Sequence, residues 1–489
     1  MDEKNYRQVI LPNGLHAILV EDTMAMRSSP ILEEYFDDED DMSCDDNGTD
    51  PSPSDDSDSD YDDDDDIPVG YRKAAAAMVV GCGSFFDPPA TQGLAHYLEH
   101  MVFMGSKKYP TENAYDDFIS KHNGDSNAYT EQEHTVFHFD INQGYCFEKA
   151  LDMFAQFFIS PLMLPDAAER ELNNVNSEFN QARFSDSSRL QQLMAYTNKI
   201  PLSDHPFSTF SWGNISSLKT KPASENVDVT QSLWDLYNRY YYARNMRLVI
   251  IAASPLDKIQ EMVSRYFSEV PSDPRLPQLP GQEITHHPDQ KSTGRRCMSP
   301  WERNSVGSPF SSGSLSAIYR VVPVKDRHRL TLTFPLPSLI DRWQTKPADY
   351  ISHLIGHESA GSILSHLKRL NWASEINAGV SDDGNENASC YSLFTISISL
   401  SESGVNYWVE IISTVFSYVN MLITTATTKN LPPHIFSELS TITNIAYSFQ
   451  DETEPGEFVE NWADELAPCK AVPSEHVLDG NLLVFDFDQ

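Results

Sequence analysis

The amino-acid sequence predicts an α+β protein with two similar domains, each a mostly antiparallel sheet packed with helices. Its 489 residues exceed the size of one typical domain. An alternating strand followed by an amphipathic helix occurs twice, about 260 residues apart. A stretch rich in Pro, Ser and Gly separates the two copies and has the composition of a linker. We therefore expect a first domain over residues 1–270, a linker over 271–316 and a second domain over 317–489.

Each domain is built from elements that the residue pattern predicts. Two apolar runs flank a Pro-Asn-Gly turn in residues 7–20, which indicates a hairpin. The small apolar residues of 73–84 predict a central strand. Residues 134–141 alternate, which is typical of a half-buried strand, and an amphipathic helix follows them. A long polar helix is expected over 166–198. In the second domain, residues 391–400 alternate again and precede a helix with an apolar face.

About half of the formal net charge of −37 lies in one segment. Residues 33–66 contain 19 Asp or Glu residues and no Lys or Arg. Because such a block repels itself and cannot be buried, we expect a disordered acidic insert between two strands of the first domain. An acidic chain without a basic face argues against nucleic acid as a partner. It favours basic peptides or proteins, and the insert suits polyamines.

The cysteines, the N-terminus and the lengths of the apolar runs indicate the cellular compartment of the protein. The six cysteines are scattered without a CxxC pair, which argues against a cysteine zinc site and favours free thiols in a reducing compartment. The N-terminus lacks the basic and apolar regions of a signal peptide, and no apolar run of 18 residues predicts a membrane span. We expect a cytoplasmic protein, with nuclear location or unconventional export to the cell surface as alternatives.

The stretch GLAHYLEHMVFMG at Gly93–Gly105 carries two histidines one helical turn apart. His96 and His100 therefore share one face of a helix and can bind one metal ion. Glu99 lies beside the pair and suits a base that takes a proton from a metal-bound water. The order H-x-x-E-H is the inverted zincin motif. The alternative is an amphipathic helix that carries two histidines by chance.

A catalytic zinc site needs a third protein ligand. Glu171 and Glu178 lie seven residues apart on the long polar helix, and two helical turns place them on one face. One can bind zinc while the other holds a histidine ring, although glutamates on a polar helix face are more often only solvated. A second pair, His353 and His357, is followed rather than divided by a glutamate and matches neither zincin order.

The motif and its surroundings resemble the pitrilysin-type inverzincin zinc metallopeptidases, the family that includes the insulin-degrading enzymes. The resemblance also rests on SNAYTEQEHTVFHFD, AQFFISPLM and ERELNNVNSEF, and, in the second domain, on GHESAGSILSHLKRLNWA and YSLFTISISL. It covers nearly the whole chain outside the acidic insert and the linker. It implies two homologous metallopeptidase-type domains, of which the first binds zinc and is catalytic and the second is not catalytic.

The resemblance implies roles for the residues of the motif and the polar helix. It implies one zinc ion per chain, bound by His96, His100 and Glu178. It assigns Glu99 as the general base. Glu171 joins the catalytic set, where it holds a histidine ring from behind.

The resemblance also implies a substrate class. Ser126, Asn127 and Ala128 resemble an edge strand that pairs with the substrate backbone, which selects extended peptides. Cleavage is expected at dibasic sites next to Arg, and an acidic surface suits such substrates.

The resemblance reaches only the N-terminal half of the large members of the family, whose two halves close around the substrate. We therefore expect a dimer or a pairing with a separate C-terminal half. The alternative function is a catalytically weak member of the family that acts as an acidic binding or regulatory protein for basic peptides or proteins.

Overall fold

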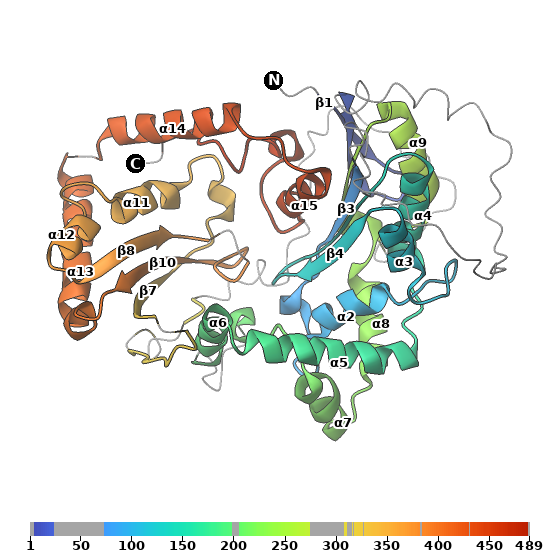
Figure 1. Ribbon diagram of the computed structural model, residues 1–489, viewed down its shortest axis with the longest axis horizontal. Coiled ribbons are helices and arrows are strands. Elements are labelled where there is room, and N and C mark those ends of the chain that lie inside the picture. Colours follow the sequence, from blue (N-terminus) through green and yellow to red (C-terminus); the bar gives the residue numbers. More distant parts are fainter. Residues whose placement is uncertain are drawn as a thin grey trace, which may run out of the picture.

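A computed structural model describes residues 4–23, 73–197, 205–273, 308–310, 315, 317–325, 327–381, 384–429 and 431–487. These residues form two sheet-containing units that lie side by side (Figure 1). The predicted acidic insert and most of the predicted linker lie outside the described residues, so both remain predictions.

The first unit contains a six-stranded sheet in the order β1-β2-β6-β3-β5-β4. All neighbours are antiparallel except β2 and β6, which are parallel. The predicted hairpin is confirmed, because β1 and β2 pair along their full length around the Pro-Asn-Gly turn. The strands are β1 (Lys4–Ile10), β2 (His16–Asp22), β3 (Ala74–Val80), β4 (Asp125–Thr130), β5 (Thr135–Ile141) and β6 (Met246–Ala252).

Helices cover both faces of this sheet. The helices that precede the second unit in the sequence are α2 (Leu94–Val102), α3 (Ala114–Lys121), α4 (Tyr145–Ile159), α5 (Pro165–Ala182), α6 (Asp186–Thr197), α7 (Lys221–Ser224), α8 (Val229–Tyr240) and α9 (Leu256–Phe267). Of these, α2, α4, α8 and α9 supply most of the apolar side chains that helices contribute to the larger core.

The central strand β3 is buried on both faces, which explains its small apolar residues. Ala76 and Met78 face the core formed with α2, α4, α8 and α9. Ala75 and Val79 face the opposite side, where Trp462 of α15 (Pro455–Glu465) packs against the sheet. Since successive residues of a strand point to opposite faces, one short strand joins the two cores.

The predicted single helix over 166–198 is wrong, because the structure has two helices there. Ser185 begins the second one: its hydroxyl accepts the backbone N–H of Ser188 at 3.4 Å. The carboxylate of Asp186 accepts the backbone N–H of Val324 at 2.7 Å. The break therefore lets α6 turn away from α5 and contact the start of the second unit (Figure 1).

The second unit repeats the mixture of helices and antiparallel strands. Its sheet has the order β7-β10-β8, and β9 pairs with the end of β10. The strands are β7 (Arg329–Leu336), β8 (Ala373–Gly379), β9 (Asn387–Ala388) and β10 (Tyr391–Leu400), and the helices are α11 (Pro347–Gly356), α12 (Ile363–Arg369), α13 (Trp408–Lys429) and α14 (Pro433–Ser448). The predicted alternating strand is confirmed as β10, whose Ile396 and Ile398 are buried against Leu364 and Val415.

The C-terminal part of the chain returns to the first unit. Helix α15 follows the second unit in sequence, yet it packs on the first sheet beside β3 (Figure 1). Trp462 stacks on Tyr6 of β1 with ring centroids 5.5 Å apart. The exact limits of the two predicted domains stay a prediction.

One helical stretch among the described residues, Gly404–Thr428, is long and apolar enough to cross a membrane by length and composition, and 11% of its apolar window is buried. Length and composition alone do not show a span, so the predicted absence of one also stays a prediction.

Candidate metal centre

Helix α2 begins at a tight approach between two backbone segments. Gly93, which caps α2, has φ of 87°, and a Cβ atom there would lie 2.1 Å from the Cα of Gly213. Only glycine allows this contact without strain. The half-buried carboxylate of Asp87 accepts the backbone N–H groups of Gly93 at 2.6 Å and Ala95 at 2.8 Å. These contacts fix the first turn of α2, which carries the first predicted metal ligand.

The structure brings the three predicted ligands together at the face between α2 and α5. One ligand atom each of His96, His100 and Glu178 lies within 4.8 Å of the other two. The Nε2 atom of His96 is 3.2 Å from Glu178 Oε2, and the Nε2 atom of His100 is 3.5 Å from Glu178 Oε1. A carboxylate between two imidazole nitrogens is a donor set typical of zinc.

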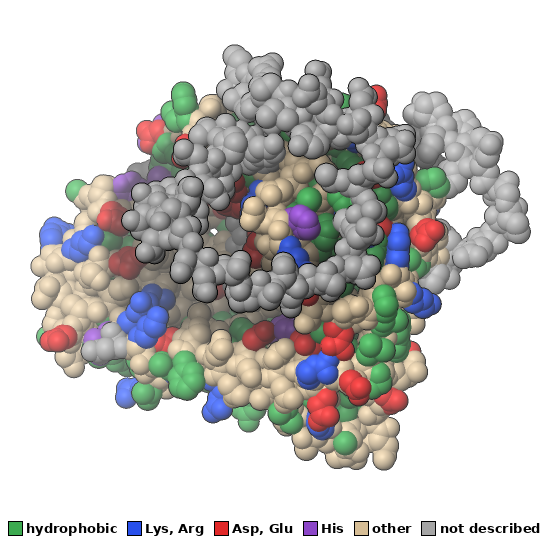
Figure 2. Space-filling view, turned by 45° about the vertical axis from the view of Figure 1, so that its right-hand side comes forward, with side chains coloured by type: hydrophobic (Ala, Val, Ile, Leu, Met, Phe, Trp, Pro, Cys, Tyr) green, Lys and Arg blue, Asp and Glu red, His purple; other side chains and the backbone are tan. Residues whose placement is uncertain are grey.

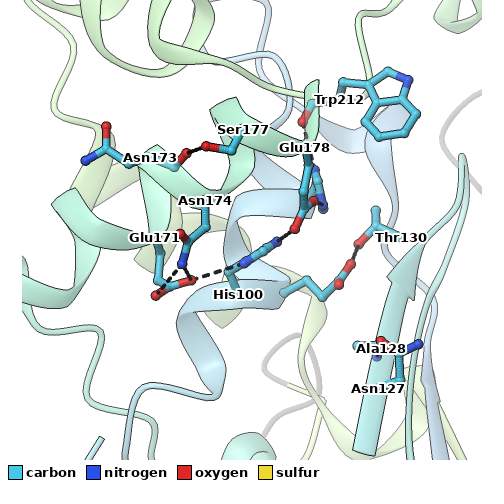
Figure 3. Close-up of polar contacts among 12 residues, drawn as sticks. His100, Asn127, Ala128, Thr130, Glu171, Asn173, Asn174, Ser177, Glu178 and Trp212 are labelled. Carbon is cyan, nitrogen blue, oxygen red and sulfur yellow. Dashed lines mark hydrogen bonds and ion pairs between the residues drawn. The ribbon is translucent and has the colours of Figure 1, made fainter. Parts of the chain in front are cut away.

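The other ring nitrogen of each histidine, Nδ1, has a hydrogen-bond acceptor. His96 Nδ1 lies 2.7 Å from the carbonyl oxygen of Trp212, and His100 Nδ1 lies 3.1 Å from Glu171 Oε2 (Figure 3). Both acceptors favour the tautomer with hydrogen on Nδ1 and leave the Nε2 lone pair free to bind a metal. The side-chain amide of Asn174 donates to Glu171 and holds that carboxylate in place. The residues present therefore fit a zinc ion.

The electrostatics of the cluster favour positive charge between its members. Burial lowers the pKa of His100, but hydrogen bonds to Glu171 and Glu178 outweigh it and raise that pKa to about 10. Burial also opposes the charged form of His96, and the hydrogen bond to Glu178 again leaves its pKa raised. Hydrogen bonds from His100 and His96 hold the pKa of Glu178 well below its usual range. A divalent cation bound among these groups would be stabilised by the same electrostatic environment.

Glu99 directly precedes His100 on α2 and is 7% exposed. The hydroxyl of Thr130, the last residue of β4, donates to Glu99 Oε2 at 2.6 Å. Burial raises the pKa of Glu99, while the nearby His96 and the hydrogen bond from Thr130 partly oppose this. A carboxylate whose pKa is raised toward neutrality is suited to accept a proton and return it.

The three predicted substrate-binding residues lie on β4, which forms one edge of the six-stranded sheet. Ser126, Asn127 and Ala128 pair with β5 on one side, and no strand among the described residues pairs with them on the other. Asn127 and Ala128 lie on the same strand that brings Thr130 to Glu99 (Figure 3). Their contact with substrate stays a prediction.

The second histidine pair is not completed by other ligands. His353 and His357 lie at the end of α11 with ring centroids 5.3 Å apart. Among the described residues, no third histidine, cysteine or carboxylate joins them in a cluster of metal-ligand geometry. That the pair has no metal role stays a prediction.

Three supporting groups of the site were not predicted from the sequence: the Trp212 carbonyl, the Thr130 hydroxyl and the Asp87 carboxylate. A backbone carbonyl leaves no signature in a sequence, and the other two reach the site only through the fold. One signal was available, because a glycine directly before a helix often marks a close backbone approach.

Comparisons with known proteins agree with this architecture. The family model described as Insulinase (Peptidase family M16) matches residues 70–205, and the model described as Peptidase M16 inactive domain matches residues 229–432. Nardilysin of Pongo abelii is 40% identical over 418 residues, which are 85% of this chain and 33% of that protein. The A-factor-processing enzyme of Saccharomyces cerevisiae is 33% identical over 488 residues, which are 99% of this chain and 39% of that protein.

Solved structures show the same fold. The crystal structure of pitrilysin superposes with a TM-score of 0.73 at 27% identity, over 100% of this chain and 43% of that chain. A protease from Helicobacter pylori superposes with a TM-score of 0.61 at 15% identity, over 99% of this chain and 94% of that chain, and supports the fold alone. The chain thus spans about a third of the length of the nardilysin that it matches.

Proposed function

Because this chain belongs to the insulinase family of peptidases, family M16, we propose that it is a zinc metalloendopeptidase with its centre on α2 and α5. The observation that carries the proposal is the convergence of His96, His100 and Glu178 within 4.8 Å. The second supporting observation is that both outer ring nitrogens have acceptors, which leaves the inner ones to bind metal.

In the proposed reaction His96, His100 and Glu178 would hold a zinc ion, which would supply Lewis acidity to a scissile carbonyl and its attacking water. Glu99 takes the proton from the attacking water and delivers it to the leaving amine. The hydroxyl of Thr130 orients the Glu99 carboxylate for both transfers.

We propose that an extended peptide adds to the edge of β4 that no strand of the described residues occupies. Backbone hydrogen bonds to Ser126, Asn127 and Ala128 would hold the peptide in register with Glu99 at the end of the same strand. Such pairing is independent of side chains, so it selects unfolded segments over folded proteins.

Cleavage at dibasic sites next to Arg is the proposed specificity. Its support is the acidic segment 33–66, which concentrates negative charge in the first domain. Acidic and basic side chains of the described residues are interspersed on the face drawn in Figure 2. The attraction for basic peptides or polyamines is therefore assigned to the insert rather than to that face.

The assembly and location follow as further proposals. As the working assembly we propose a dimer or a pairing with a C-terminal half of the kind that the longer matched relatives contain. Free thiols favour a reducing, cytoplasmic location.

The test combines metal analysis with peptide cleavage. We expect about one zinc per chain and cleavage of a quenched Arg-Arg peptide, with little cleavage of a matched Gln-Gln peptide. Glu99→Gln should keep zinc and lose cleavage by at least a hundredfold, as expected when a general base is removed. His96→Ala and Glu178→Ala should lose zinc. Bound zinc without Glu99-dependent cleavage, tested with and without a C-terminal half, would leave only the alternative of a binding protein for basic peptides.

A further inference from the structure

A cavity of about 1250 Å³ lies between the first sheet and the second unit, away from the metal centre. The first sheet contributes Tyr129 and His134 to its wall, and the second unit contributes Trp343. Asp464, near the end of α15, and Cys469, in the turn that follows, complete this part of the wall. The cavity therefore brings a thiol, an imidazole and a carboxylate together from segments far apart in the sequence.

The three groups form a connected chain. His134 Nε2 lies 2.6 Å from Asp464 Oδ1, and His134 Nδ1 lies 3.6 Å from Cys469 Sγ. His134 is 4% exposed and Cys469 is 7% exposed. Both nitrogens of the imidazole are thus used, one toward a carboxylate and the other toward a thiol.

This arrangement places a base beside the thiol. With Asp464 accepting the hydrogen on Nε2, the other ring nitrogen can take the proton of Cys469 and form an imidazolium–thiolate pair. Burial opposes charge on His134, but Asp464 and Cys469 outweigh it and raise its pKa well above the usual value. Lys470 also donates to Asp464 and Glu465, so the half-buried carboxylate that faces the imidazole has a second cationic partner.

Two other cysteines of the described residues have different surroundings. Burial raises the pKa of Cys82, which also lies near the charge of Asp87. Burial likewise raises the pKa of Cys146. These thiols therefore provide internal controls for the reactivity of Cys469.

We propose that Cys469 is a nucleophilic modification site that forms a mixed disulfide with a small-molecule disulfide entering the cavity. The thiolate sulfur attacks one sulfur of the reagent, a new S–S bond forms and the original S–S bond breaks. The leaving thiolate takes the proton from His134, so the reagent is the oxidant and no other reactant is required. None of these groups takes part in the proposed peptide hydrolysis, and the site stands independently of it.

The experiment measures the rate of modification of each cysteine by 4,4′-dithiodipyridine at pH 6.5, with the modified peptides identified by mass spectrometry. At that pH about 1% of an ordinary thiol is ionised, so a thiol that is ionised more fully reacts faster. Part of this increase in rate is lost because a less basic thiolate is a weaker nucleophile. We expect Cys469 to react roughly tenfold faster than Cys146 in the unaltered protein.

Variants then test the origin of the rate. His134→Gln should reduce the rate at Cys469 to that of Cys146, while Cys469→Ser should abolish labelling at this position and keep bound zinc. Circular dichroism checks that each variant is folded. The proposal is overturned if Cys469 of the unaltered protein reacts no faster than Cys146, or if a folded His134→Gln variant labels at an unchanged rate. The first comparison needs no variant, so a misfolded substitution cannot leave the question open.

Discussion

Substitution of Glu171 by Gln tests how much the hydrogen bond from His100 to this carboxylate contributes to metal binding. The carboxylate accepts from His100 Nδ1 at 3.1 Å and is 8% exposed, so its charge is poorly screened by water. Gln keeps an oxygen acceptor of the same length but removes the charge that makes the imidazole a better ligand. Loss of such a partner typically weakens metal binding about 10- to 100-fold. This corresponds to about 1.4–2.8 kcal/mol of zinc-binding free energy.

The assay is competition for zinc against a chromogenic chelator, with the bound metal confirmed by mass spectrometry. Glu169→Gln is the matched control, because Glu169 lies on the same helix and pairs with Lys219 at the surface. We expect Glu171→Gln to shift the dissociation constant by the amount above and Glu169→Gln to leave it unchanged. If a folded Glu171→Gln variant binds zinc within twofold of the unaltered chain, the role assigned to this carboxylate is wrong.

Three further outcomes are expected. Thr130→Val removes one hydrogen bond to the general base and should lower kcat by at least about tenfold, with zinc retained, since hydrogen bonds to charged groups contribute about 1.5–3 kcal/mol. Gly93→Ala should disrupt the start of α2 and lose both zinc and thermal stability, whereas Gly144→Ala, which also has positive φ but has no neighbour within 4 Å, should keep zinc. Asp464→Asn should lower the melting temperature most between about pH 4 and 6.5. In that window Asp464 is charged because its pKa is lowered, and His134 is protonated because its pKa is raised. The stabilisation by this ion pair is lost at lower pH as Asp464 becomes protonated. It is lost at high pH as His134 loses its proton. Equal melting curves for the Asn variant and the unaltered chain across this range would refute the ion pair.

Most of the correct predictions came from patterns of neighbouring residues in the sequence. The Pro-Asn-Gly turn and its apolar flanks predicted the first hairpin, and strict alternation predicted β5 and β10. Such features depend on neighbours in the sequence, because a strand exposes every second residue and a tight turn needs particular residue types. The predicted continuous helix over 166–198 was wrong because it missed a local signal, the Ser185 hydroxyl that accepts the Ser188 N–H at the start of α6. Asp186 of α6 also contacts Val324, far along the chain.

The sequence by itself determined which of the predicted site residues share a helix face. Spacings of four and seven residues place His96 with His100, and Glu171 with Glu178, on helix faces by geometry alone. Only the tertiary structure decided that these two faces meet, with the ligand atoms within 4.8 Å.

The tertiary structure also supplied the partners that orient those ligands. The Trp212 carbonyl lies next to His96 because Gly93 and Gly213 approach each other closely. Thr130 lies next to Glu99 because of the register of β4 with β5. Helix α15 returns to the first sheet and places Cys469 beside His134, 335 residues away in the sequence. Helical periodicity is a property of one segment and can be read along the chain. Contacts between distant segments depend on how whole elements pack, and no local spacing encodes them.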